Sequence, residues 1–339
     1  SGDYVGGFVG KNFGNIENGT ANISVFDGKY AGGFVGNNDK QGKINSCSSK
    51  GSTTGYYCVG GFCANNKGII LESMSKGNAV AKTDTVDKTK CGGFVGNNDK
   101  QGKIAGCISK GSAIGQEYVG GFCGDNKGEI SKSNSEVNAT AKTESNTNRC
   151  GGFVGENRGS VKDSNATGSV TGEEYVGGFV GVNKNEIVDC NAHGKATAKT
   201  KIHTALAGGF VGENENGKIT NCTATGGADS RSSSGQAKAG GFVGINKTSI
   251  MISKASGNVY LSAGTCYKDD GCGGFVGKND QGGSIDGCYA EATVETTNKK
   301  KGGSFVGEAK SKSMIKNSQC KTKIVTKSGT KNNTKFCEN

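Results

Sequence analysis

Short apolar runs return along this chain at a nearly constant spacing. A Gly-Gly-Phe-Val-Gly pattern, or a close variant of it, recurs every 26 to 33 residues. The Phe residues of the pattern are Phe8, Phe34, Phe62, Phe94, Phe122, Phe153, Phe179, Phe210, Phe242, Phe275 and Phe305. A fixed period in this range indicates a solenoid, a propeller or another repeat array.

The apolar pattern inside one repeat favours strands. Phe and Val are followed by a Gly and a polar turn, then by an isolated Ile or Val, then by small residues and another Gly. Such short β-branched and aromatic runs between Gly and Asn turns are typical of strands, and no stripe with a 3.6-residue period predicts a helix. One repeat cannot bury its own apolar face, so neighbouring repeats must stack. The sequence therefore predicts an all-β parallel β-solenoid of about eleven coils over residues 1–318. A propeller is the alternative, although its blades normally need longer units.

In ten of the eleven repeats an Asn follows the Phe by four residues. This asparagine column holds Asn12, Asn38, Asn66, Asn98, Asn126, Asn157, Asn183, Asn214, Asn246 and Asn279. If the coils stack in register, each side-chain amide can bond its equivalent in the next coil and can cap turn backbone groups. We expect a continuous asparagine ladder.

The composition separates this interpretation from disorder. Only 32% of residues are hydrophobic, with 61 Gly and no Pro or Trp, which is thin for a globular core of 339 residues. A disordered low-complexity chain would share that composition but would not phase its aromatic residues. The regular Phe spacing therefore favours a repeat protein with a narrow core over a disordered chain.

The positive charge is concentrated near the C-terminal end. Residues 299–339 hold eleven Lys and two Glu, a net of +9, and the other residues contribute +2 to the total of +11. We treat 319–339 as a Lys-rich tail, either simply solvated or able to dock on acidic glycans or a cell-wall polymer. Nucleic acid is not expected, because the tail offers only Phe336 for base stacking. Membrane insertion is not expected, because no apolar run has the length of a span.

Fourteen Cys without a C-x-x-C motif favour disulfides and an oxidising, extracellular location. The chain begins at Ser1, so we expect either a secreted product without its signal peptide or a trimmed chain. Cys63 and Cys123 each replace the Val after Phe, and the next repeat then carries Cys91 or Cys150 three residues before its Phe. This coupled substitution predicts disulfides Cys63–Cys91 and Cys123–Cys150, provided the bend brings the two columns within bonding range. Two further candidate pairs are Cys190–Cys222 and Cys320–Cys337, the latter able to close the tail or bridge to another chain.

With these columns laid out, the chain resembles the GLUG-motif repeats of microbial surface proteins and adhesins. Residues 209–226, GFVGENENGKITNCTATG, carry the likeness most clearly, and it extends over about residues 4–318. The resemblance implies a secreted, surface-located and prokaryotic repeat protein. It brings no catalytic residue with it, because the motif is scaffold.

A search for chemistry in the sequence finds no enzyme signature. Glycosidases need two carboxylates in one cleft, whereas the acids recur three or five residues after Phe, in turns, and predict a stacked, solvated edge. They are Asp39, Asp99, Glu156, Glu213 and Asp280. His193 and His203 lie in repeat loops and are expected to be exposed. The turns at 37–42 and 97–102 offer oxygen ligands for calcium, but few carboxylates. No catalytic residue, metal or cofactor is predicted.

Seven Asn-x-Ser/Thr sequons suit a glycosylated surface protein. They begin at Asn18, Asn22, Asn138, Asn165, Asn221, Asn246 and Asn332. Because Asn246 also belongs to the asparagine column, the other six are the glycosylation candidates.

Three functions remain open at this level. The first is a self-assembling filament, sheath or surface-layer subunit. It rests on the absence of an N-terminal cap before Gly6, which leaves a strand edge for a head-to-tail copy to cover. The second is an adhesin or binding module that presents solenoid loops to glycans or a host surface. The third is a carbohydrate-active β-helix enzyme.

Overall fold

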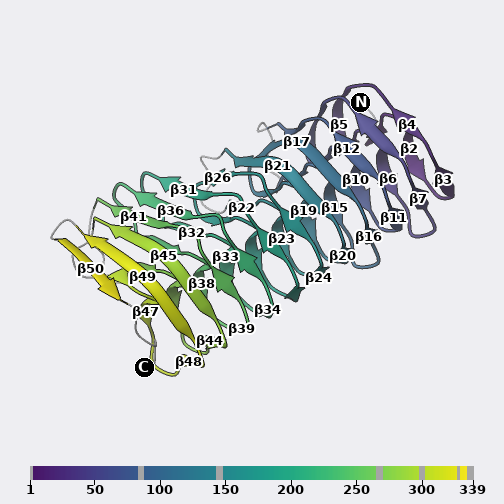
Figure 1. Ribbon diagram of the computed structural model, residues 1–339. Helices are drawn as coiled ribbons and strands as arrows, with labels where there is room; N and C mark the ends of the chain where they lie inside the picture. The colour runs from purple at the N-terminus through teal and green to yellow at the C-terminus, as the bar shows by residue number, and fades with distance from the viewer. Residues whose placement is uncertain are drawn as a thin grey trace. The chain divides into compact units, whose positions relative to one another are not determined.

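The computed structural model is built from strands that stack in parallel, coil upon coil. It describes residues 3–82, 88–142, 148–264, 270–297, 302–326 and 329–333, and these contain strands and turns but no helix. The chain divides into two compact units, Ser1–Gly168 and Ser169–Asn339. In each unit the strands of successive coils lie side by side (Figure 1). The predicted all-β parallel β-solenoid is confirmed.

Each coil turns through four short segments that recur in the same order. We call them the pre-bend, Phe, Ile and small-residue columns.

In the first unit the pre-bend column holds β1 (Tyr4–Gly6), the end of β5 (Val25–Gly32), the end of β9 (Thr53–Gly60), β14 (Lys90–Gly92), β18 (Tyr118–Gly120) and β22 (Arg149–Gly151). The Phe column holds β2 (Val9–Asn12), β6 (Val35–Asn38), β10 (Cys63–Asn66), β15 (Val95–Asn98), β19 (Cys123–Asn126) and β23 (Val154–Asn157). The Ile column holds β3 (Asn15–Glu17), β7 (Lys43–Asn45), β11 (Ile69–Leu71), β16 (Lys103–Ala105), β20 (Glu129–Ser131) and β24 (Ser160–Lys162). The small-residue column holds β4 (Thr20–Ala21), β8 (Ser48–Lys50), β12 (Met74–Lys76), β13 (Ala79–Ala81), β17 (Ile108–Gly115), β21 (Asn134–Ala141) and β25 (Asn165–Ala166).

The second unit repeats this order. Its pre-bend column holds β27 (Tyr175–Gly177), β32 (Ala205–Gly208), β37 (Ala237–Gly240), β42 (Gly271–Gly273) and β46 (Gly302–Gly303). Its Phe column holds β28 (Val180–Asn183), β33 (Val211–Asn214), β38 (Val243–Asn246), β43 (Val276–Asn279) and β47 (Val306–Ala309). Its Ile column holds β29 (Ile187–Val188), β34 (Ile219–Thr220), β39 (Ser249–Met251), β44 (Ser284–Asp286) and β48 (Met314–Lys316). Its small-residue column holds β26 (Val170–Gly172), β30 (Asn191–Ala192), β31 (Ala196–Thr200), β35 (Thr223–Ala224), β36 (Ala228–Ser232), β40 (Lys254–Ala255), β41 (Val259–Ala263), β45 (Tyr289–Thr296) and β49 (Gln319–Thr326), followed by β50 (Gly329–Asn333).

The Gly-Gly pair makes the bend between the pre-bend and Phe columns. A Cβ on Gly60 would lie 1.9 Å from the carbonyl oxygen of Cys63, because the chain folds back on itself there. A Cβ on Gly61 would lie 2.2 Å from the carbonyl oxygen of Gly93 in the next coil. The first Gly is therefore required by the reversal and the second by the stacking.

The Phe side chains form the centre of the core in each unit. From Phe34 to Phe275 they are fully buried, and consecutive rings within a unit stack with centroids 4.7 to 4.9 Å apart. This distance is the spacing of paired strands, so the rings simply follow the backbone register. Burial of one such side chain stabilises the fold by about 1.5–3 kcal/mol.

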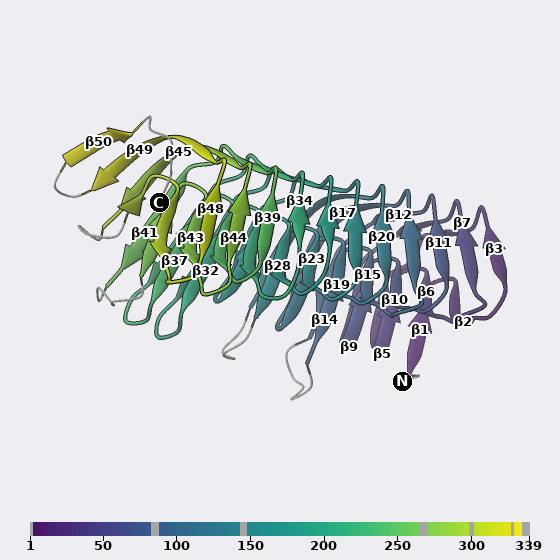
Figure 2. The ribbon, with the colours of Figure 1, turned by 90° about the horizontal axis from the view of Figure 1, so that it is seen from below.

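Residues 319–326 of the Lys-rich segment belong to the solenoid. β49 pairs in parallel with β45 over its whole length, from Gln319 opposite Tyr289 to Thr326 opposite Thr296, so the solenoid continues past residue 318. The chain then reverses, and β50 pairs antiparallel with β49. Figures 1 and 2 both show β50 beside β49.

Candidate functional site

The asparagine column lies in the interior and links one coil to the next. Asn98 Nδ2 donates to Asn126 Oδ1 at 2.9 Å, and Asn98 Oδ1 accepts from Asn66 Nδ2 at 2.9 Å. The same amide-to-amide bond joins the column from Asn12 to Asn157 in the first unit and from Asn183 to Asn279 in the second. The ladder is thus a scaffold feature that satisfies buried amides.

A second ladder, of Cys and Ser, runs three residues after the Ile column. The backbone N–H of Cys47 donates to Ser73 Oγ, and the N–H of Ser73 donates to Cys107 Sγ. Each side chain also donates to the carbonyl two residues before it, as Cys222 does to Thr220. Cys and Ser therefore perform the same task here, which is to bond the turn of one coil to the next.

The predicted disulfides Cys63–Cys91, Cys123–Cys150 and Cys190–Cys222 are wrong, because all six residues are buried thiols. Cys63 lies opposite Val35 and Val95 in the Phe column, whereas Cys91 lies opposite Val59 and Val119 in the pre-bend column.

The two columns stand on different strands, and their thiols point to different backbone carbonyls. Cys63 donates to the carbonyl of Asn65 and Cys91 to that of Ala79. The pair Cys123 and Cys150 repeats this placement. Cys190 and Cys222 do share a column, but each donates to a carbonyl of its own turn. Cys320 is disulfide-bonded, and its predicted partner Cys337 lies outside the described residues.

Burial makes these thiols poor nucleophiles. Desolvation raises the pKa of the Cys63 and Cys91 thiols to about 12. Cys107 and Cys288 are raised to about 12 for the same reason. Since the thiolate is the reactive form, this chemistry argues for packing rather than for catalysis.

A charged seam lies where the pre-bend and Phe columns face each other across the Gly-Gly bend. In the first unit Asp125 is almost fully buried, and its carboxylate lies 2.9 Å from Lys90 Nζ. Glu156 is fully buried, and Arg149 Nε lies 2.7 Å from its carboxylate. In the second unit the buried Glu213 pairs instead with Lys247, which lies in the turn after β38 of the next coil, at 2.5 Å.

This seam corrects one expectation about the acids. Glu156 and Glu213 do not belong to a solvated edge. Glu156 is buried beside Arg149 of the pre-bend column, and Glu213 is buried beside Lys247. Asp39 and Asp99 do lie in turns, where each accepts the N–H of the following Lys. The seam joins neighbouring coils through complementary charges, and a buried pair of this kind fixes register more than it adds stability.

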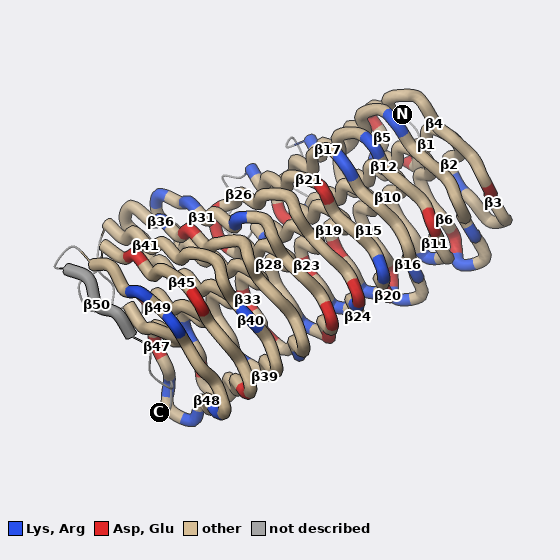
Figure 3. Tube along the Cα trace, in the orientation of Figure 1, with Lys and Arg blue, Asp and Glu red and all other residues tan. Residues whose placement is uncertain are grey.

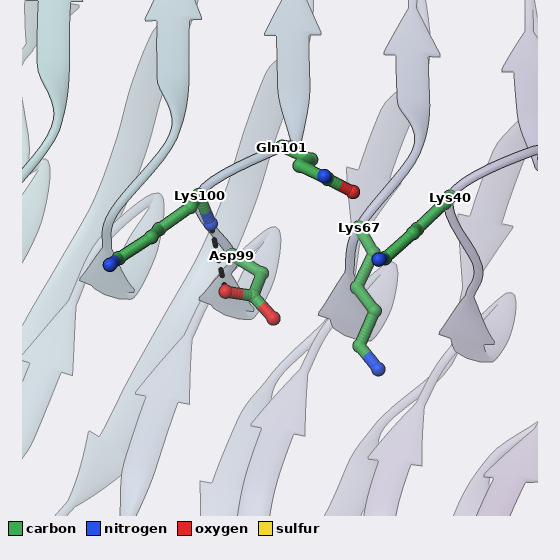
Figure 4. A pocket seen from close by; sticks show the side chains of 5 residues that line it. All are labelled: Lys40, Lys67, Asp99, Lys100 and Gln101. Carbon is green, nitrogen blue, oxygen red and sulfur yellow. Dashed lines mark hydrogen bonds between the residues drawn. The ribbon is translucent and has the colours of Figure 1, made fainter.

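A shallow depression of about 240 Å³ lies over the turns of the first unit, lined by Lys40, Lys67, Asp99, Lys100 and Gln101 (Figure 4). The carboxylate of Asp99 is used by the backbone N–H of Lys100. Its lining of three lysines around one acid does not suit calcium. Across the described residues, no group of three or more His, Cys, Asp or Glu is placed to hold a metal ion.

A larger depression, of about 470 Å³, opens on the small-residue column of the second unit. Its polar lining comes from successive coils and includes Lys195, Thr225, Asn258, Tyr260, Thr293 and Glu295. Tyr260 lies between Asp229 on one neighbouring strand and Glu295 on the other. We call this depression the Tyr260 groove. Sequence reasoning missed it, because its residues fall in the variable part of the repeats.

Two ion pairs centred on the buried Asp229 hold the side chains around the Tyr260 groove in place. The Asp229 side chain is only 3% exposed and accepts from Lys195 Nζ at 2.9 Å and from Arg231 Nε at 2.8 Å. Arg231 in turn lies over the Tyr260 ring, 4.8 Å from its centroid. Burial opposes ionisation of Asp229, but the hydrogen bonds from Arg231 and Lys195 outweigh it and lower the pKa of this carboxyl. A glycosidase acid needs a raised pKa, so Asp229 does not suit that role.

The remaining candidate residues are on the surface. His193 is exposed, with its Nδ1 2.8 Å from Thr225 Oγ1, and His203 is half-buried. Among the sequons, Asn18, Asn22, Asn138 and Asn221 are exposed and Asn165 is half-buried. Asn246 is fully buried in the ladder, and the side chain of Asn332 lies outside the description. Figure 3 shows basic and acidic residues distributed over the coils of both units.

The stacked coils and their internal ladders define a β-solenoid repeat protein. A family model of the GLUG motif matches residues 203–229 and 272–295, each of which spans a Gly-Gly-Phe bend or the strands beside it. The chain therefore carries the GLUG motif in these two stretches.

Comparison with individual proteins adds little. No curated protein matches the chain. A solved structure of a provisionally named immunoglobulin A1 protease from Bacteroides ovatus is 11% identical, covers 94% of this chain and 75% of its own, and has a TM-score of 0.29. No conclusion about activity rests on that likeness. In the described part of the chain, no helix has the length and apolarity that a membrane crossing requires.

Proposed function

We propose that this chain is a non-enzymatic structural protein of the cell exterior, which provides a stiff segment of stacked coils. The observation that carries the proposal is the asparagine ladder, because ten coils each place a buried amide where it bonds the equivalent amide of a neighbouring coil. Buried polar ladders of this kind are costly unless fully satisfied, and satisfied they rigidify a core. GLUG repeats and the sequons support an exterior location.

The polar groups with enzyme-like features have structural tasks. The buried carboxylates of Asp125, Glu156 and Glu213 are occupied by neighbouring cations. The buried thiols stay protonated at neutral pH. The charged seam and the buried thiols therefore support a role in holding the fold together and not in catalysis.

A substrate panel tests the non-enzymatic part of the proposal. The purified chain is incubated with plant, fungal and bacterial polysaccharides and with casein and immunoglobulin A1, and products are followed by reducing-end assay and mass spectrometry. We expect no turnover. Turnover that is lost in a Glu295→Gln or Asp229→Asn variant, but kept in a Glu136→Gln surface control, would overturn the proposal.

Head-to-tail assembly into a filament, sheath or surface layer is a narrower proposal. The antiparallel pairing of β50 bears on it, because β50 occupies the edge of β49 that a following coil would need. A second copy would have to pair through β47 and β48 instead. Electron microscopy of the purified chain tests this: regular polymers support assembly, and dispersed single particles at high concentration contradict it.

A further inference from the structure

The Tyr260 groove combines an aromatic side chain with a rim of hydrogen-bonding groups. Tyr260 is half-buried, while Lys195, Thr225, Asn258 and Glu295 around it are exposed. We propose that the Tyr260 groove binds a neutral oligosaccharide, with the tyrosine ring as the platform for a sugar ring. This site is independent of the structural role proposed above.

The aromatic platform is held in place before any ligand arrives. Asp229 lies beneath the surface and accepts from both Arg231 and Lys195, and the Arg231 guanidinium lies against one face of the Tyr260 ring. The clamp is anchored on the buried Asp229 carboxylate, while the Lys195 and Arg231 side chains that it holds are about half exposed. Because these bonds already restrain the side chains around the ring, less side-chain freedom is left to lose on binding. A flat, amphipathic ring in a fixed position is what the C–H face of a sugar needs.

The rim supplies donors and acceptors of both kinds. Lys195 carries N–H donors, Glu295 a carboxylate, and Thr225 a hydroxyl. Asn258 accepts the backbone N–H of Thr293 through its Oδ1, which fixes the direction of its amide. A ligand rich in hydroxyl groups, each able to donate and accept, fits such a mixed rim better than a purely anionic or apolar one.

The charge balance and the strand pairing around the Tyr260 groove argue against a nucleic acid and against an extended peptide as its ligand. Lys195 and Arg231 are balanced by Asp229 and Glu295, so the surplus of cations that a nucleic acid requires is missing. An extended peptide would add to an open strand edge, but β41 is paired on both sides, with β36 and with β45.

The length of the groove sets the size of the ligand. Its lining comes from four successive coils, from Lys195 through Thr225 and Asn258 to Thr293. At one strand spacing per coil this is roughly 14 Å across the strands. An oligosaccharide of a few sugars, laid across the strands over Tyr260, matches that length.

Calorimetric titration with four neutral tetrasaccharides tests the proposal: cellotetraose, xylotetraose, mannotetraose and chitotetraose, with tetragalacturonate as the charged comparison. We expect at least one neutral tetrasaccharide to bind, and Tyr260→Ala to weaken it about tenfold or more, a loss of about 1.4 kcal/mol. Glu295→Ala, at an exposed rim position, gives a second variant that does not threaten the fold. Tyr289→Ala is the matched control, since Tyr289 lies on the neighbouring strand β45 outside the groove lining.

Each result decides the matter. Loss of binding in the Tyr260 and Glu295 variants with retention in the Tyr289 variant supports the site. The proposal is overturned if no neutral tetrasaccharide binds up to about 10 mM, a weaker affinity than any useful site would have. It is also overturned if tetragalacturonate binds more tightly than all four, or if Tyr260→Ala binds as well as the unaltered chain.

Discussion

Asn98 donates its side-chain amide to Asn126 in the next coil, at 2.9 Å, and neither residue has any exposed surface. Asn98 also accepts from Asn66 in the preceding coil. One side chain therefore connects three coils, and the stacking of the first unit depends on it directly.

Replacement of Asn98 by Ala is expected to lower the free energy of unfolding by about 2–4 kcal/mol. The substitution removes the partner of a buried donor, Asn66 Nδ2, and of a buried acceptor, Asn126 Oδ1. Chemical denaturation followed by circular dichroism measures this. Asn22→Ala, at an exposed position, serves as the control and should change stability by less than about 0.5 kcal/mol. Equal effects of the two variants would show that the ladder carries no special share of the stability.

Ile252 is held in a strained backbone conformation. Its φ is 51°, in the left-handed region that disfavours a β-branched residue, and its side chain is 63% exposed. The same turn position in other coils holds Asn18, Asn221 and Asn317. Ile252→Asn is therefore expected to raise the free energy of unfolding by about 1 kcal/mol.

Thermal and urea unfolding measure that gain. Ile202→Asn is the matched control, since Ile202 is 68% exposed and is not among the positive-φ residues. If Ile252→Asn stabilises no more than Ile202→Asn does, the turn strain is not relieved by the substitution and the prediction is wrong.

Alkaline pH should destabilise the fold through its buried thiols. The Cys63 thiol ionises near pH 9.0 in the unfolded chain, whereas burial raises its folded pKa to about 12. The free energy of unfolding is therefore unaffected by ionisation of this thiol below about pH 9. As the pH rises from there towards 12, ionisation of the thiol in the unfolded chain lowers the free energy of unfolding by about 1.4 kcal/mol per pH unit.

Unfolding free energies measured from pH 8 to 11 test this sign. Cys63→Val gives this position the residue that Val35 and Val95 supply in the same column. The variant should show a smaller decrease of the unfolding free energy with pH, because one ionising thiol has been removed. Val95→Ala should lower stability at every pH without changing the slope. A Cys63→Val chain with an unchanged slope would contradict the assignment.

The strand β50 is expected to protect the edge of β49. Removal of residues 327–339 would expose the unpaired backbone of β49, from Thr322 to Thr326, to pairing with another chain. Light scattering after gel filtration should then show concentration-dependent oligomers, while the full chain stays at lower mass. A truncated chain that stays monomeric over the same concentrations would show that β50 has no such role.

The sequence predicted the repeating core but not the burial of the acids that follow Phe. Phe and Asn recur at fixed positions, so their stacking follows from the period alone. In the sequence Glu156 and Glu213 resemble residues of a solvated edge, because a polar residue after Phe gives no sign that it is buried beside a cation.

The disulfide prediction failed for a related reason. Cys63 and Cys91 differ in column by four residues around the bend, and only the strand register shows that they lie opposite Val residues and not each other. The Tyr260 groove lies in the variable half of the repeat. In that half the residue types do not recur from repeat to repeat, so the sequence does not show which of them are neighbours. The strand register does: it places Tyr260 between Asp229 and Glu295.

Single-molecule stretching tests the central claim, that coil-to-coil ladders make this chain a stiff structural segment. With the chain held at residues 3 and 326, we predict that it lengthens in steps of about 100 Å, the extended length of one repeat, and that Asn98→Ala lowers the force of a step. Smooth extension at low force without steps, or forces unaffected by Asn98→Ala, would contradict the account.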